Sequence, residues 1–418
     1  MLIKLGWKNI IKRPFSSGLS IVLLASSLMI ILLAILTMDQ LESKFNENAN
    51  KIDLVIGAKG SRLQLVLCNV FHIDNPTGNI KMDEVDFLSK HPFIQSAIPI
   101  SLGDSYKSYR IVGTELNFIT QLYKTPLAKG RLYEKSLEIV VGANVAKKLN
   151  LKLGDTFYGS HGIEESIHDH DDFEYSIVGI LNSSGEVIDN LLITPLESVW
   201  DVHPEDNHKG SFDLREEKEE DHHNHHDHEH HHHKEEAKQI TAVLINYNSG
   251  RGKFTVPSMV NKKDHLMAAE PAIEIQQLLE LIQPAIKVIT ILAWFIFSLA
   301  IISMIITILN SMKDRKYEIA MMRVAGSKAR TVLFSILIEG FLVAFIGSLL
   351  GFVLGHLFMG LIGYFLSNNY HYEFSGLIFN FSEIWLFIGT IIIGMVSALF
   401  PAISAYRIDI SSTLKNNI

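Results

Sequence analysis

The densest group of potential metal ligands in this chain is a histidine tract at residues 221–233, with the sequence DHHNHHDHEHHHH. Imidazole nitrogens are common ligands of Zn²⁺ and Cu²⁺, and the acidic residues between them could add oxygen ligands. The spacing defines no single geometry, so it predicts loose binding through several alternative ligand sets. The other interpretation is a low-complexity insertion with incidental metal affinity. The candidate ligands are His222, His223, His225, His226, His228, His230, His231, His232 and His233.

Residues 228–232 of this tract also spell H-E-x-x-H. In metalloproteases that motif needs an ordered helix that holds two histidines on one face beside a catalytic glutamate. Such a match is almost inevitable in a repetitive tract, so we do not interpret it as a protease site. The surrounding segment, 203–238, contains too few apolar residues to bury a core and is predicted to be a loop.

A second distinctive segment is 310–330, NSMKDRKYEIAMMRVAGSKAR, which lies between two long apolar runs. Its basic residues outnumber its acidic ones. Ile319, Met322 and Val324 with Met321 are expected to form an apolar face, and Gly326 is expected to end the helix. The pattern is compatible with a solvated connector or with a helix against which a cytoplasmic partner pushes.

The apolar run that follows contains two ionisable residues, which are costly inside a membrane unless they are paired or near its surface. We expect Glu339 to reach the interface or to pair with a cytoplasmic base, rather than to bind substrate or carry protons. His356 is expected to be a neutral packing residue. Three glycines at four-residue steps favour close helix packing, against this subunit or a dimer mate. They are Gly347, Gly351 and Gly355.

Four long apolar runs in the sequence are expected to form the helices that hold the charged segment, the two ionisable residues and the glycines in place. Each is long enough to cross a hydrocarbon core of about 30 Å as a helix. The first run follows four basic residues but lacks a small-residue cleavage site, so it is expected to be a retained anchor. The distribution of Lys and Arg predicts that both termini and the 310–330 segment are cytoplasmic. The runs are residues 17–38, 288–309, 332–366 and 384–405.

The long segment between the first two runs is expected to be an α+β domain in two lobes, with helical extensions of both spans as a stalk. Residues 80–90 have a helical pattern, and 143–149 are expected to form a short helix. Cys68 is the only cysteine, so no intramolecular disulfide can stabilise this domain. The expected strands are 51–56, 109–112, 137–141, 173–181 paired with 191–194, and 241–246.

Some functional classes find no support in the sequence. No basic patch with interleaved aromatic residues suggests nucleic-acid binding. No phosphate loop of the form G-x-x-x-x-G-K-[ST] occurs, and no catalytic residues are predicted. Any ATP hydrolysis would therefore need another chain.

Four blocks resemble the FtsX-like ABC transporter permeases, particularly the MacB-type and lipoprotein-releasing branch. Their order and spacing extend over nearly the whole chain, although the histidine tract is not part of the family pattern. The blocks are LGWKNIIKRPFSSGLSIVLLA at 5–25, LEIVVGANVAKKLNLKLGDTF at 137–157, DRKYEIAMMRVAGSKARTVLFSILIEG at 314–340 and SALFPAISAYRIDISSTLK at 397–415.

The resemblance implies four transmembrane helices, a large extracytoplasmic MacB-like α+β domain between helices 1 and 2, and an FtsX-like domain at 288–410. The expected order is a lead-in (1–16), a span (17–38), the external domain (39–287), a span (288–309), a coupling loop (310–331), a span (332–366), an external loop (367–383), a span (384–405) and a tail (406–418).

The resemblance further implies a subunit that transmits ATP-driven motion for export or release of a lipoprotein, a peptide or a similar cargo. Its expected partners are a cytoplasmic ATP-binding subunit, a second permease copy or related permease, and possible periplasmic adaptors, in a bacterial cytoplasmic membrane. It needs no intrinsic cofactor. The alternative function is a Zn- or Cu-responsive sensor. The expected ATPase-coupling residues are Tyr317, Glu318, Met321, Met322, Arg323 and Gly326.

Overall fold

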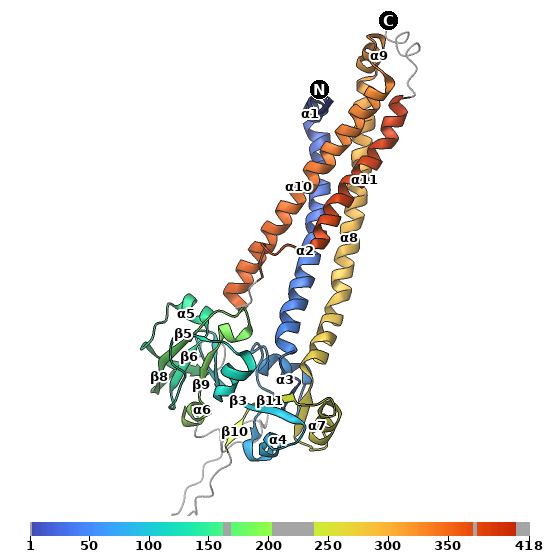
Figure 1. The fold of residues 1–418 in the computed structure, drawn as a ribbon. Helices are drawn as coiled ribbons and strands as arrows, with labels where there is room; N and C mark the ends of the chain where they lie inside the picture. The colour runs from blue at the N-terminus through green and yellow to red at the C-terminus, as the bar shows by residue number, and fades with distance from the viewer. Residues whose placement is uncertain (1, 162–168, 203–237, 371–373, 407–418) are drawn as a thin grey trace, which may run out of the picture. The chain divides into compact units, whose positions relative to one another are not determined.

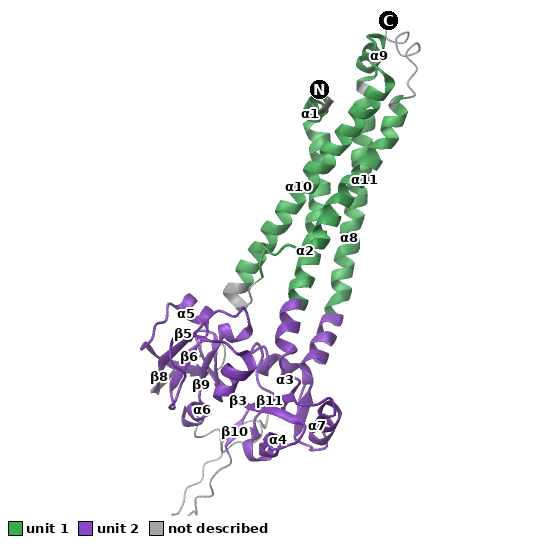
Figure 2. Cartoon of the chain, viewed as in Figure 1, with its two compact units in different colours: residues 1–42, 281–418 green, residues 43–280 purple. Residues whose placement is uncertain are grey.

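A computed structural model of the chain describes residues 2–161, 169–202, 238–370 and 374–406. The chain divides into two compact units, a helical unit of Met1–Glu42 with Leu281–Ile418 and an α+β unit of Ser43–Glu280 (Figures 1 and 2). The α+β unit therefore lies between the first and second long helices in the sequence, as predicted.

Four helices of the helical unit are long and apolar enough to cross a membrane, which confirms the predicted fold class. They extend beyond the apolar runs at one or both ends. Pro271 begins α8, a position where its missing N–H costs nothing. The helices are α1 Leu2–Lys12, α2 Pro14–Ala49, α8 Pro271–Asp314, α9 Lys316–Val324, α10 Ala329–Tyr370 and α11 Phe381–Tyr406.

Close packing in this unit depends on the three glycines of α10, which face α2. A Cβ atom on Gly347 would lie 2.7 Å from Leu24 Cδ2, and one on Gly351 would lie 2.7 Å from the carbonyl oxygen of Ala25. These separations are shorter than real Cβ contacts, so the helices can approach this closely only without side chains there. The contact is within one subunit.

The α+β unit is built on one large mixed sheet rather than on separate lobes. Its strands follow the order β12-β1-β11-β3-β4-β9-β6-β8-β5, with β7 pairing with β3 and β8, while β10 pairs with β2 apart from it. The strands are β1 Leu54–Ala58, β2 Ile80–Lys81, β3 Ile94–Tyr106, β4 Tyr109–Thr114, β5 Leu127–Gly130, β6 Glu138–Val141, β7 Thr156–His161, β8 Asp169–Leu181, β9 Leu192–Thr194, β10 Gln239–Ile240, β11 Ala242–Tyr247 and β12 Leu266–Ala269.

Short helices cover this sheet and complete two hydrophobic clusters. One cluster includes Leu54, Ile56 and Val256, and the other includes Ile139, Val141 and Tyr175. The expected two lobes thus correspond to two cores on a continuous sheet. The covering elements are α3 Arg62–Asn69, η1 Met82–Glu84, α4 Asp86–Ser89, η2 Phe118–Tyr123, α5 Ala143–Leu149, η3 Val187–Asn190, α6 Leu196–Val202 and α7 Gly252–Val260.

Two local predictions for this unit were wrong. Residues 80–90 form a short strand, a 3₁₀ turn and a single α-helical turn instead of one helix. Ile80 pairs with Ile240 in β10, so tertiary pairing overrides the helical pattern there. Strands β8 and β9 do not pair with each other, because β6 lies between them.

The block at 137–157 shows how local chemistry builds one part of this fold. Helix α5 ends at Asn150 in the left-handed conformation, with φ of 59°. Gly154 follows with φ of 86°, a backbone region that favours glycine. The Asp155 carboxylate accepts a hydrogen bond from the Lys152 backbone N–H at 2.7 Å, which closes the turn between α5 and β7.

Candidate functional site

Helix α9 is a short helix between two membrane-length helices. Arg315 separates it from α8, and Gly326, with φ of 94°, ends it as expected. Ile319 is buried, whereas Met321 is 48% exposed and Val324 is 62% exposed. The predicted single apolar face was therefore wrong, because residues two positions apart lie about 200° apart around a helix.

Ion pairs and hydrogen bonds connect α9 with the helices around it. The Glu318 carboxylate lies 3.2 Å from Arg315 Nε and 3.7 Å from Lys12 Nζ. The hydrogen bond from Arg315 holds the pKa of Glu318 below its usual range. Lys12 and Glu318 are both exposed, whereas Arg315 is half-buried, so the Lys12 pair fixes an orientation more than it stabilises the fold.

A buried carboxylate continues this network into α10. Glu339 lies 4.0 Å from Arg315 Nη1 and accepts a hydrogen bond of 3.2 Å from the Asn9 side-chain amide. The expectation that Glu339 would pair with a base is thus met by Arg315. The same guanidinium bridges Glu318 of α9 and Glu339 of α10, while Asn9 adds α1 to the network.

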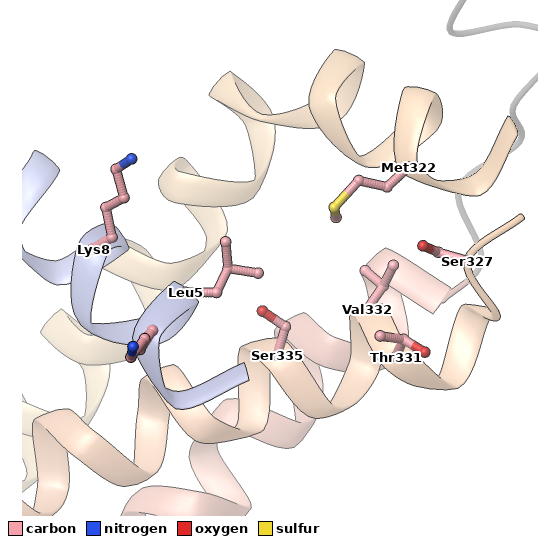
Figure 3. Close-up of a pocket in the computed structure, with 8 residues that line it drawn as sticks. Leu5, Lys8, Met322, Ser327, Thr331, Val332 and Ser335 are labelled. Atoms are coloured by element: carbon pink, nitrogen blue, oxygen red, sulfur yellow. The ribbon is translucent and has the colours of Figure 1, made fainter. Parts of the chain in front are cut away.

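A pocket of about 420 Å³ lies beside this network, between α1, α9 and α10. Figure 3 shows Leu5, Met322 and Val332 directed into the same space. Met322 is half-buried at its wall, so it is less accessible to a partner than the neighbouring Met321. The lining residues are Lys4, Leu5, Lys8, Met322, Ser327, Thr331, Val332 and Ser335.

The other predicted coupling residues all lie on α9 or at its end. Tyr317 is within the helix, and its side chain is outside the described part. Arg323 is half-buried, and Gly326 provides the turn that leads towards α10. The sequence prediction missed Arg315 and Asn9 as partners of this helix. The α1 lysines at four-residue spacing were the available signal for a second element at the site.

A second polar cluster lies where α10, the chain before α11 and the start of α11 meet. His356 Nδ1 lies 2.8 Å from the carbonyl oxygen of Gly376, and Nε2 lies 3.0 Å from Glu383 Oε2. His356 also packs against Phe352 and Phe379, as a packing residue should. The sequence prediction missed its hydrogen-bonding role, because Glu383 appeared only as an acid at the edge of an apolar run.

Metal ligation by the histidine tract, His222 to His233, falls outside the described residues. Within the described ranges, no group of three or more His, Cys, Asp or Glu side chains is arranged to hold a metal ion. The α+β unit does contain a cleft of about 810 Å³, whose lining includes Glu115, Tyr133, Glu197 and Trp200. Burial raises the pKa of Glu115, and the charge of Glu197 adds to this effect.

Four membrane-length helices with an α+β unit inserted after the first define a multi-pass membrane protein. Residues 290–410 match the FtsX-like permease C-terminal model, and residues 17–221 match the MacB-like periplasmic core domain model. The chain belongs to the FtsX-like ABC transporter permease family, whose members are membrane components that work with an ABC ATPase. The resemblance predicted from the four blocks is confirmed.

Two solved structures are similar to part of the chain. The periplasmic region of MacB from Actinobacillus actinomycetemcomitans is 15% identical, covering 57% of this chain and 98% of that chain, with a TM-score of 0.34. The extracellular domain of the noncanonic ABC-type transporter YknZ from Gram-positive bacteria is 10% identical. The match covers 51% of this chain and 98% of that domain, with a TM-score of 0.31. No curated protein matches the chain significantly.

Proposed function

We propose that this permease subunit transmits conformational change from a cytoplasmic ATP-binding subunit to its α+β unit, for export or release of a lipoprotein, peptide or similar cargo. The observation that carries the proposal is the pair of contacts made by Arg315, which ion-pairs with Glu318 of the short helix α9 and with Glu339 of α10. A partner that displaces α9 would move α10 through these contacts. The exposed Met321 and Val324 would supply the docking surface.

The proposal places the chain in a bacterial cytoplasmic membrane with both termini and α9 in the cytoplasm. The excess of Lys and Arg in α1 and around α9 supports this orientation. Two copies, or one copy with a related permease, would form the working unit.

The test is association with an ABC ATP-binding subunit from the same genome. Both proteins are co-expressed, extracted in a neutral detergent and purified through a tag on the permease. Met321→Glu places a charge on the proposed docking surface and should reduce co-purification and ATPase stimulation about tenfold or more, since a buried unpaired charge costs several kcal/mol.

Phe254→Glu provides the matched control, because Phe254 is an exposed apolar residue of the α+β unit. That variant should retain association and ATPase activity. Normal co-purification and ATPase stimulation with Met321→Glu would contradict the assignment of α9 as the input helix. Absence of any association with the unmodified chain would contradict the proposal as a whole.

The alternative function is a metal-responsive sensor, and its support is the composition of the tract at 221–233. Deleting these residues should alter growth or transport under zinc or copper limitation or excess if the tract senses metal. Unchanged behaviour across that range would eliminate the sensor function and leave the coupling proposal intact.

A further inference from the structure

The pocket between α1, α9 and α10 has the properties of a small-molecule site. Its volume of about 420 Å³ falls within the roughly 300–1,000 Å³ typical of ligand pockets. Its wall is mostly apolar, with Leu5 from α1, Met322 from α9 and Val332 from α10 facing one another (Figure 3). Ser327, Thr331 and Ser335 also line it.

The charged side chains at this pocket have a single sign. Lys4 and Lys8 are one helical turn apart, both are exposed, and no carboxylate contributes to the lining. Lys12 continues the same stripe of α1 and pairs with Glu318. Lys4 and Lys8 have no ion-pair partner among the described residues, so their charges are available to an anion.

The other exposed side chains of α1 indicate the source of such an anion. Ile3, Trp7 and Ile11 form an exposed apolar stripe directly beside the lysine stripe. A basic helix with such a stripe is typical of one that lies in the membrane interface. Helix α2 begins two residues after α1 ends, so Lys4 and Lys8 lie shortly before the first membrane-length helix in the sequence.

We propose that this pocket binds an anionic phospholipid from the leaflet in which α1 lies. Lys4 and Lys8 contact the headgroup phosphate, and the upper part of one acyl chain lies against Leu5, Val332 and Met322. The lipid then forms part of the contact between α1 and α9. The proposal rests on the geometry of the helical unit and does not depend on ATPase coupling.

The experiment is native mass spectrometry of the full-length chain in a neutral detergent, with phosphatidylglycerol or phosphatidylcholine of identical acyl chains added. The unmodified chain should retain phosphatidylglycerol preferentially. The double variant Lys4→Gln/Lys8→Gln should lower phosphatidylglycerol retention about tenfold or more, because each lysine at a membrane surface contributes a several-fold factor to binding of anionic lipid.

The matched control is Lys313→Gln/Lys316→Gln, which removes two exposed charges that do not line the pocket. It should change retention less than about twofold, the size of effect expected when exposed charges lie away from the site. Thr331→Trp should reduce retention by filling the pocket without altering either lysine. Displacement by free inorganic phosphate alone would identify a phosphate site and contradict lipid binding.

Equal retention of both lipids, or equal losses in the two lysine double variants, would overturn the proposal. If Thr331→Trp abolished ATPase association while lipid retention was unchanged, the pocket would be a protein docking site instead. Because lipid retention is measured without the ATPase, a negative result here is distinguishable from failure of the coupling proposal.

Discussion

His72 is a buried histidine in the α+β unit whose two ring nitrogens have no hydrogen-bond partner there. Burial, followed by the nearby charge of Arg110, lowers its pKa from 6.5 to about 3. It is therefore neutral at physiological pH. Its φ of 57° also places it in a left-handed region that non-glycine residues seldom adopt.

This histidine should make the α+β unit sensitive to acid. The unfolded chain binds a proton near pH 6.5 and the folded chain only near pH 3, so the stabilisation is complete above pH 6.5 and is lost as pH falls towards 3. The expected loss is about 2 kcal/mol by pH 5. Urea unfolding followed by Trp200 fluorescence, with the other tryptophans replaced by Phe, measures it in the full chain.

His72→Asn is the informative variant for this prediction. Asn tolerates the left-handed backbone and does not titrate, so the part of the pH dependence between 6.5 and 3 that comes from His72 should disappear. The same slope in the variant and in the unmodified chain would show that other groups cause the acid sensitivity.

His356 and Glu383 form a polar pair between two membrane-length helices. The carbonyl oxygen of Gly376 can only accept, so the Nδ1 of His356 must donate, and Nε2 shares a proton with the Glu383 carboxylate or donates to it. Removing Glu383 leaves Nε2 of His356 without this partner, and removing His356 leaves Oε2 of a fully buried carboxylate without it. Glu383→Ala should therefore destabilise the chain by about 3 kcal/mol.

A double-mutant cycle with His356→Ala isolates this interaction. The two substitutions should be non-additive by about 1 kcal/mol or more in chemical unfolding of the chain in detergent. Additive effects would mean that the pair contributes through packing alone.

At the scale of elements, the glycines of α10 decide how closely that helix approaches α2. A Cβ at Gly351 would meet the carbonyl oxygen of Ala25 at 2.7 Å, whereas one at Gly360 on the same helix would meet nothing within 4 Å. Alanine is the better helix former by about 1 kcal/mol. Gly360→Ala should thus be neutral or stabilising, and Gly351→Ala should be destabilising.

Thermal unfolding of the two alanine variants tests this difference directly, because the substitution and the helix are the same. The expected gap between them is about 2 kcal/mol or more, since overpacking costs roughly 1–3 kcal/mol in addition to the lost propensity gain. Equal melting temperatures would show that the helices separate without penalty and that the glycines have no packing role.

The helices and the α5 block were predictable because each depends on local signals. Apolar length defined the four spans, and the helix expected at 143–149 is α5. The order of the sheet was not predictable, because β6 pairs with β8 and β9 through contacts between residues far apart in the sequence. The secondary structure of short segments such as 80–90 is decided by such long-range strand pairing.

At the scale of the whole molecule, two helices belong to both units. Helices α2 and α8 continue through the boundaries at residues 42/43 and 280/281. Transmission of motion between the units requires these helices to remain rigid, since a flexible segment would absorb a displacement.

Inserting Gly-Ser-Gly-Ser after Glu280 should therefore uncouple the units. Binding of the ATPase should be retained, but ATP with vanadate should no longer change the protease sensitivity of the α+β unit. The same insertion after Gly250, in an exposed turn, serves as the control. A normal nucleotide response with the first insertion would contradict transmission through α8.

The sequence by itself determined the class of this protein: four spans, an inserted α+β unit and a charged helix between the second and third spans. These features follow from apolar length, charge distribution and local turn chemistry, which act over neighbouring residues. Only the tertiary structure decided which side chains meet, including Arg315 with Glu339, His356 with Glu383, and Leu5 with Met322 and Val332 around one pocket. Such pairs depend on how helices pack across long sequence separations, and the spacing along one helix does not contain that information.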